Sequence, residues 1–254
     1  MGAADEGVFD RMAARYDELR PADRAWWEQF ELTGSAGLAA STRLLDIGCG
    51  TGRLANAAAE RFGVRAWGVD SSTAMVEQAR AGAGKGVAFR VASADALPFR
   101  DGWFDAVTMR LVVHTLGDAR PNAIREAARV LGPGGRVFIW TFAPEHFTGF
   151  YLAPYLPSLP AIDLARFPTP ARLADELVAA GFATVEELTL QQAGSIGRAE
   201  AAARVRAGYI STVHLLPPDE VAAAVQRLEA EAAGGAPALA TVLDWRLLVA
   251  RRSA

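Results

Sequence analysis

The chain has 254 residues, 51% of them hydrophobic and 22% charged, and a formal net charge of −3. This composition is ordinary for a globular protein, so we expect a single domain over residues 1–254. The negative charge disfavours a nucleic-acid partner, no apolar run reaches the ~18 residues of a membrane span, and the acidic start at residues 1–6 is unlike a secretory signal. We therefore expect a cytoplasmic protein that binds neither membrane nor nucleic acid, with its oligomeric state left open.

Strands and helices are predicted to alternate along the chain, which is typical of a parallel sheet covered on both faces. Strands are predicted at 43–47, 65–69, 87–91, 104–109, 135–142 and 183–190, with a seventh candidate at 241–251. Asp118 is expected to cap a helix that has Pro121 in its first turn. Thr169 is expected to cap another helix, which begins at Pro170 and ends before Gly181.

The segment that follows the first predicted strand has the features of a cofactor-binding turn. A buried strand at 44–47 leads into glycines at alternate positions, Gly48, Gly50 and Gly52, which let the backbone turn sharply and approach a ligand. Amide groups at the start of the next helix would face that ligand. A dinucleotide fingerprint, Gly-x-Gly-x-x-Gly, needs a third glycine where Arg53 stands, so NAD is disfavoured as the cofactor.

An acidic residue and three downstream segments make the pattern more specific. Asp70 ends the second predicted strand about 20 residues after the glycine turn, where nucleoside-binding α/β folds place a carboxylate that accepts hydrogen bonds from ribose hydroxyls. The segments 94–99, 104–107 and 129–135 then follow in a fixed order and at a fixed spacing. The glycine turn alone would be weak evidence, but the combination predicts a nucleoside-containing cofactor.

These motifs together resemble the class I S-adenosyl-L-methionine (SAM) dependent methyltransferases, in particular the ubiquinone and menaquinone C-methyltransferases of the methyltransferase type 11 family. The likeness covers roughly residues 5–190. It implies an α/β, Rossmann-like fold: a seven-stranded, mostly parallel sheet with helices on both faces, helical lid insertions, and an antiparallel last strand, 241–251, as an edge partner. It also implies SAM as the cofactor and S-adenosyl-L-homocysteine (SAH) as its product.

The resemblance assigns a set of cofactor-binding positions. The set is Tyr16, Asp46, Gly48, Cys49, Gly50, Gly52, Asp70, Ser71, Asp95, Ala96 and Arg110. In this family the glycines lie under the methionine part of SAM, Asp70 matches the ribose-binding acid, and the Asp95 carboxylate meets the adenine amino group with the Ala96 amide beside it. The backbone of Arg110 would contact the methionine ammonium. Tyr16 belongs to an N-terminal lid and would close over SAM.

Two segments go beyond the minimal fold, and insertions of this kind select among substrates. The first, 143–168, is rich in aromatic residues and prolines and leaves the carboxyl end of a strand, where ligands of open α/β sheets bind. The second, 195–236, is alanine-rich and helical. With the lid at 1–40, these segments are expected to roof an acceptor pocket above the cofactor-binding core, 41–142. The alternative is that their aromatic side chains only pack onto the sheet.

Methyl transfer from SAM is an in-line displacement, to which the protein contributes alignment and the exclusion of water. A base is needed only when the acceptor keeps its proton. His114 follows the fourth strand and is the candidate catalytic residue, whereas His146 and His214 lie in the insertions. For each histidine the alternative is a packed or solvated side chain. The single cysteine, Cys49, allows no internal disulfide or cysteine-based zinc site, and no metal is expected.

The sequence therefore predicts a SAM-dependent methyltransferase that acts on a small apolar or aromatic molecule, with O- or C-methylation favoured over N-methylation. One alternative is a SAM-binding sensor or partner protein without transfer activity. Another is a nicotinamide-dependent dehydrogenase on the same fold, which Arg53 already disfavours.

Overall fold

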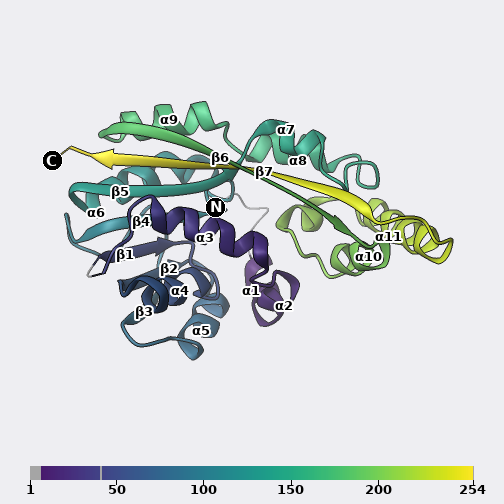
Figure 1. The fold of residues 1–254 in the computed structure, drawn as a ribbon, viewed down its shortest axis with the longest axis horizontal. Helices are drawn as coiled ribbons and strands as arrows, with labels where there is room; N and C mark the ends of the chain where they lie inside the picture. Colours follow the sequence, from purple (N-terminus) through teal and green to yellow (C-terminus); the bar gives the residue numbers. More distant parts are fainter. Residues whose placement is uncertain (1–6, 41, 254) are drawn as a thin grey trace.

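The structure, a computed structural model, describes residues 7–40 and 42–253, so the expectation about residues 1–6 lies outside it. Seven strands form one mixed sheet in the order β3-β2-β1-β4-β5-β7-β6 (Figure 1). The strands are β1 Arg43–Ile47, β2 Arg65–Asp70, β3 Val87–Val91, β4 Phe104–Arg110, β5 Leu131–Phe142, β6 Phe182–Ile196 and β7 Leu239–Arg252. Strands β1 to β5 pair in parallel and β7 is antiparallel to its neighbours, so the predicted fold class is confirmed.

The last strand differs from the prediction in its place in the sheet. β7 pairs with both β5 and β6, so the edge strand on this side is β6 and the expectation of an antiparallel edge partner at 241–251 was wrong. Burial explains the order, because Leu247, Leu248 and Ala250 of β7 are buried whereas most of β6 is exposed or half-buried. A strand with buried side chains on both faces gains more from a central position than a largely exposed one.

Both of these strands are longer than predicted. β6 begins at Phe182 and continues to Ile196, and its last residues pair only with the first half of β7, from Gln192 opposite Leu243 to Ile196 opposite Leu239. This two-stranded ribbon extends beyond the rest of the sheet and leads into α10 and α11, the helical insertion seen at its far end (Figure 1).

Helices cover both faces of the sheet. They are α1 Val8–Met12, α2 Tyr16–Leu19, α3 Arg24–Ser35, α4 Arg53–Phe62, α5 Thr73–Ala81, α6 Arg120–Val130, α7 Pro144–Thr148, α8 Leu159–Arg166, α9 Pro170–Ala179, α10 Arg198–Arg206 and α11 Pro218–Ala233. Side chains of α3, α4 and α5 pack on one face, and those of α6 and α9 pack on the other (Figure 1). Buried apolar strands between two helical layers are the expected core of this architecture.

One predicted helix cap is present and one is not. The Thr169 hydroxyl accepts a hydrogen bond from the Arg172 amide at 3.2 Å and α9 begins at Pro170, as predicted. Asp118 does not cap α6, because it lies inside a 3-10 turn and the residue before the helix is Ala119 in a helical conformation. A capping side chain needs an extended backbone at its own position, and this turn does not provide one.

The two insertions form a core of their own. Residues of the first, including Phe150, Leu152 and Leu156, pack against residues of the second, including Val205 and Leu228, in one buried cluster. Their side chains therefore bury apolar surface chiefly against each other, at the end of the β6–β7 ribbon.

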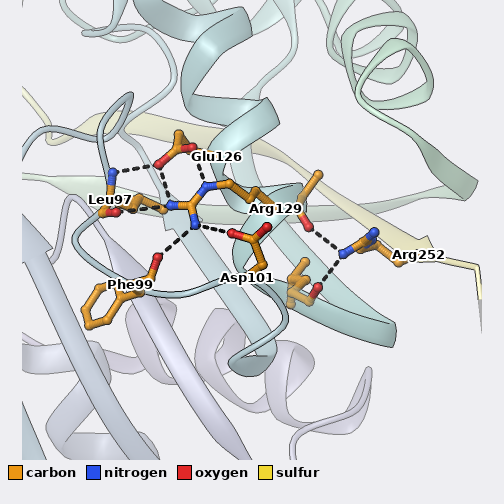
Figure 2. Close-up of polar contacts among 8 residues, drawn as sticks. Leu97, Phe99, Asp101, Glu126, Arg129 and Arg252 are labelled. Atoms are coloured by element: carbon orange, nitrogen blue, oxygen red, sulfur yellow. Dashed lines mark hydrogen bonds and ion pairs between the residues drawn. The ribbon is translucent and has the colours of Figure 1, made fainter.

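The loop after β3 is held to α6 by one arginine (Figure 2). The Arg129 guanidinium donates hydrogen bonds to the carbonyls of Leu97 and Phe99, at 3.1 and 2.8 Å, and to the Asp101 carboxylate at 2.7 Å. It also binds Glu126, whose carboxylate accepts the Leu97 amide at 2.7 Å. These bonds fix the segment that follows Asp95, one of the predicted cofactor residues.

Candidate active site

Two adjoining cavities open at the carboxyl ends of the parallel strands, with volumes of about 490 and about 100 Å³. The residues that line both are Phe9, Tyr16, Gly48, Gly50, Arg110 and Leu111. The larger cavity extends from the glycine loop under the two insertions, and the smaller one extends toward the ends of β2 and β3. This is the position at which open α/β sheets bind ligands.

The glycine loop has three left-handed residues with different neighbours. Gly48, Gly50 and Gly52 have φ angles of 70°, 52° and 81°. A Cβ on Gly50 would meet nothing nearer than Tyr16 at 4.0 Å, so this glycine leaves open space in the cavity. A Cβ on Gly52 would lie 2.4 Å from the Phe89 ring. Gly52 does not line either cavity, and its small size serves the packing of α4 against β3.

Asp70 joins the end of β2 to the glycine loop. Its carboxylate accepts hydrogen bonds from the amides of Gly50 and Ser72, both at 2.9 Å, and it lines the smaller cavity together with Ser71. Burial raises the pKa of Asp70, and the two backbone hydrogen bonds oppose this rise. The carboxylate is therefore fixed at the point where the loop and the smaller cavity meet.

Asp95 also lines the smaller cavity, and its carboxylate accepts a hydrogen bond from the Ser93 hydroxyl. Ala96 is not among the lining residues, and its amide donates to the Ser93 carbonyl at 3.2 Å. The structure therefore brings Asp95, but not the Ala96 amide, to this cavity. Apolar side chains that sequence reasoning missed complete the lining, among them Met75 and Leu116.

The floor of the larger cavity holds a buried carboxylate and a half-buried guanidinium. Asp46 is 2% exposed and accepts a hydrogen bond from the Thr108 hydroxyl at 2.7 Å. Burial raises its pKa to about 7, against the effect of that hydrogen bond. Burial lowers the pKa of Arg110 to about 10. The sequence assigned only the backbone of Arg110 to the cofactor, whereas its side chain also reaches the cavities. Cys49 lines the larger cavity too, and burial raises its pKa.

A chain of hydrogen bonds connects Arg110 to the last strand. Arg110 donates to the Gln29 side-chain oxygen at 2.8 Å, and Gln29 donates to Gln192 at 3.2 Å. The Trp245 indole donates to the same Gln192 oxygen at 2.9 Å. Sequence reasoning missed this chain, because no motif marks its members and 163 positions separate Gln29 from Gln192.

The N-terminal segment lies against the glycine loop. The Asp17 carboxylate accepts hydrogen bonds from the Thr51 hydroxyl at 2.8 Å and from Arg53 at 2.5 Å. Arg20 donates to the Tyr16 hydroxyl at 2.8 Å and to the Tyr209 carbonyl at 2.6 Å. This segment therefore contacts both the glycine loop and the second insertion.

One side of the larger cavity is a wall of stacked rings, which we call the aromatic wall: His114, Phe142, His146, Phe167 and Trp245. The His114 and Phe167 rings stack with centroids 3.9 Å apart, as do those of Phe142 and His146, and Trp245 lies 4.0 Å from Phe142. All five residues line the cavity. Flat apolar surface of this kind fits a planar acceptor.

Two of the three histidines belong to the aromatic wall. Burial lowers the pKa of His114 well below its usual value, and the charges of Arg166 and Arg20 add to this effect. Burial lowers the pKa of His146 to about 4. The buried Nδ1 atoms of both rings lack a hydrogen-bond partner among the described residues. His214 does not line either cavity and contacts the Gly208 carbonyl at 3.1 Å.

Polar groups from the two insertions also line the larger cavity. The Thr212 hydroxyl donates to the Asp163 carboxylate at 2.6 Å, and the Tyr151 and Tyr209 hydroxyls are hydrogen-bonded at 2.8 Å. Burial raises the pKa of Asp163 to about 6, and the bond from Thr212 opposes the rise. Both insertions thus contribute residues to the lining of the larger cavity.

The described part of the chain contains no group of three or more His, Cys, Asp or Glu residues that could hold a metal ion. Within residues 7–40 and 42–253, no helix is long and apolar enough to cross a membrane.

The fold and the site define a class I methyltransferase. A glycine loop follows β1, a carboxylate ends β2, and both meet a cavity at the carboxyl ends of a sheet whose last strand is antiparallel. These residues fit SAM, since Gly50 leaves open space beside the loop and Asp70 offers a carboxylate for a ribose.

Comparison with known proteins supports the assignment to the methyltransferases. A family model described as "Methyltransferase domain" matches residues 45–139. The chain is 34% identical to the demethylmenaquinone methyltransferase of Thermus thermophilus over 209 residues, which cover 71% of this chain and 94% of that protein. It is 41% identical to the 27-O-demethylrifamycin SV methyltransferase of Amycolatopsis mediterranei over 143 residues, covering 54% of this chain and 50% of that protein.

A solved structure of the Haemonchus contortus phosphoethanolamine N-methyltransferase 2, in complex with SAM, has the same fold, with a TM-score of 0.63. It is 18% identical, and the match covers 100% of this chain and 61% of that one. The chain therefore belongs to the class I SAM-dependent methyltransferases, and SAM is its cofactor.

Proposed function

We propose that this methyltransferase transfers the methyl group of SAM to an oxygen or carbon atom of a small apolar or aromatic molecule. The observation that supports the acceptor class most directly is the aromatic wall of the larger cavity. The relatives named for demethylmenaquinone and demethylrifamycin act on molecules of that class, which adds support. The net charge of −3 favours a small-molecule acceptor over a nucleic acid. We propose that the enzyme acts in the cytoplasm.

The proposed roles follow the two cavities. The smaller cavity would take the adenosine, with Asp70 at the ribose, Ser71 beside it and Asp95 at the adenine amino group. The glycine loop, with Asp46 and Arg110, would face the methionine part. We propose that residues 1–40 with Tyr16 form the lid, that 41–142 form the cofactor-binding core, and that 143–168 and 195–236 form the acceptor roof.

SAM supplies a methyl group on a positively charged sulfur, which makes the transfer favourable once the nucleophile is aligned. The chain contributes orientation and the exclusion of water, and orientation is worth up to ~7 to 11 kcal/mol in the best cases. The stacked rings would hold a planar acceptor against one side of the cavity, and the insertions would cover it.

Calorimetry and a transfer assay test this proposal. SAH is expected to bind at micromolar to sub-millimolar concentration, whereas NAD is not, because Arg53 occupies the position of the third glycine. A radiolabelled screen of phenols, quinols, carboxylic acids and amines with methyl-labelled SAM should give labelled ether or carbon-methylated products. SAH binding without methyl transfer to any acceptor would favour the alternative, a SAM-binding sensor or partner protein without transfer activity. Binding of NAD alone would contradict the cofactor assignment.

His114 is expected to be part of the wall and not a general base. Its pKa is lowered by burial, so it is neutral at pH 7 but a weak proton acceptor, and its ring stacks on Phe167. His114→Gln should therefore change kcat by less than about fivefold, with unchanged SAH affinity. His214→Gln, outside the cavity, is the control. A loss of about 10² to 10⁴ in kcat, with an acid limb that disappears in the variant, would identify His114 as the base instead.

A further inference from the structure

Two of the arginines that line the larger cavity form no ion pair with a described residue, although five carboxylates also line it: Asp17, Asp23, Asp46, Asp163 and Glu200. Four arginines line it, and two of them have carboxylate partners: Arg53 is paired with Asp17 at 2.5 Å, and Arg204 with Glu200 at 2.6 Å. The remaining two are Arg20 and Arg110.

Among the described residues, those two arginines donate hydrogen bonds only to neutral oxygen atoms. Arg20 donates to the Tyr209 carbonyl and the Tyr16 hydroxyl, and Arg110 donates to the Gln29 amide oxygen. Among the residues that the structure describes, neither guanidinium forms an ion pair. Each has further N–H groups, since a guanidinium carries five donors. A half-buried cation with free donors is a site for an anion.

The positions of the two arginines distinguish their ligands. Arg110 is the last residue of β4, lies beside the glycine loop and lines both cavities, which places it at the methionine carboxylate of SAM. Arg20 lines only the larger cavity and reaches the second insertion at Tyr209. The pKa of His114, in the aromatic wall, is lowered mainly by burial, and the positive charge of Arg20 lowers it further. Asp46 and the methionine carboxylate would both offset the charge of Arg110, whereas Arg20 has no carboxylate partner among the described residues.

The two wall histidines are poor groups to remove a proton from the acceptor. Burial lowers the pKa of both wall histidines, so they are weak bases. The two carboxylates of raised pKa that line the larger cavity, Asp46 and Asp163, each already accept a hydrogen bond from a threonine hydroxyl. The Asp163 carboxylate accepts its hydrogen bond from the Thr212 hydroxyl and lies 3.8 Å from the Arg166 guanidinium. An acceptor that needs no base, because it is already an anion, fits these surroundings better than a neutral alcohol or a protonated amine.

We infer that Arg20 determines acceptor specificity by binding an acidic oxygen of the acceptor, a phenolate or a carboxylate. This inference rests on the proposed function. In the transfer step a lone pair of that oxygen forms the new O–C bond, the C–S bond breaks with its electron pair going to sulfur, and the sulfonium becomes the thioether of SAH. The oxygen becomes neutral, so no proton has to leave during the step. The proton is lost to solvent before the acceptor binds.

The probe for this inference is 4-nitrophenol, whose absorbance reports its own ionisation, added to the complex of the protein with SAH. Binding next to Arg20 should lower the apparent pKa of the bound phenol by about one unit, which is about a tenfold preference for the phenolate. Arg20→Gln should abolish this shift and change the SAH Kd by less than about threefold, whereas Arg20→Lys should keep part of it.

The control is Arg15→Gln, in the same N-terminal segment, where the arginine is exposed and paired with Glu18. It should leave the shift intact. Thermal melts of both glutamine variants show whether a lost shift comes from lost binding or from unfolding. If Arg20→Gln does not fold, Arg20→Lys takes its place in the comparison.

Four results would overturn the inference while leaving the proposed function in place. They are no binding of 4-nitrophenol at millimolar concentration, no shift in the wild type, a shift that persists in Arg20→Gln, and a loss of tenfold or more in SAH affinity in that variant. The last would assign Arg20 to the cofactor carboxylate. Failure of the wild type to bind SAH would contradict the proposed function itself.

Discussion

Asp70→Ala is expected to weaken SAH binding by about 10- to 100-fold, or ~1.5 to 3 kcal/mol, the scale of hydrogen bonds to a charged group. Two effects add. The carboxylate proposed for the ribose hydroxyls is lost, and the Gly50 and Ser72 amides lose the acceptor that holds the glycine loop to β2. Methyl transfer at low SAM concentration should fall in parallel, because the loss is in cofactor affinity.

Calorimetric titration with SAH measures the effect directly. The SAH affinity of Asp70→Asn should lie between that of the wild type and that of Asp70→Ala, since one oxygen remains as an acceptor but the charge is gone. Asp105→Ala is a matched control, because this carboxylate binds Arg43 and lines neither cavity. A folded Asp70→Ala variant that loses less than threefold in affinity would show that the ribose does not depend on this carboxylate.

Arg129→Ala is expected to lower the free energy of unfolding by about 2 to 4 kcal/mol. The variant leaves two loop carbonyls and the Glu126 carboxylate without the donor that binds them (Figure 2). Because the loop follows Asp95 in the smaller cavity, SAH affinity should fall as well. Urea unfolding at pH 7 measures the stability change.

The ion pair between Arg129 and Glu126 makes the stability of the folded protein depend on pH, and the direction of the change can be stated. The hydrogen bond and charge of Arg129 lower the pKa of Glu126 below 4.5, so this contribution is present above pH 4.5 and is lost as the pH falls through the lowered value. The difference between wild type and Arg129→Ala should shrink over that window. Arg125→Ala, an exposed arginine on the same helix, should change stability by less than ~0.5 kcal/mol. Equal losses for the two variants would contradict the special role of Arg129.

The sequence by itself determined the parallel half of the fold and located the glycine loop and the end of β2, which line the cavities. The bounds of β1 to β4 could be predicted within a residue, because a buried parallel strand is a short apolar run that local composition reveals. The glycine loop and Asp70 could be found for a related reason. A left-handed turn needs glycine, and the residue that ends a strand is fixed by where the strand ends.

The tertiary structure alone decided the rest. Whether β7 lies inside the sheet or at its edge depends on which strand has more surface to bury, and this is a comparison between segments far apart in the chain. Gly52 packs on Phe89 and the Ala96 amide bonds within its own turn, although motif position assigned both to the cofactor. Arg20 reaches Tyr209 across 189 positions. Contacts of this kind leave no local pattern in the sequence, because the chain must fold before the partners meet.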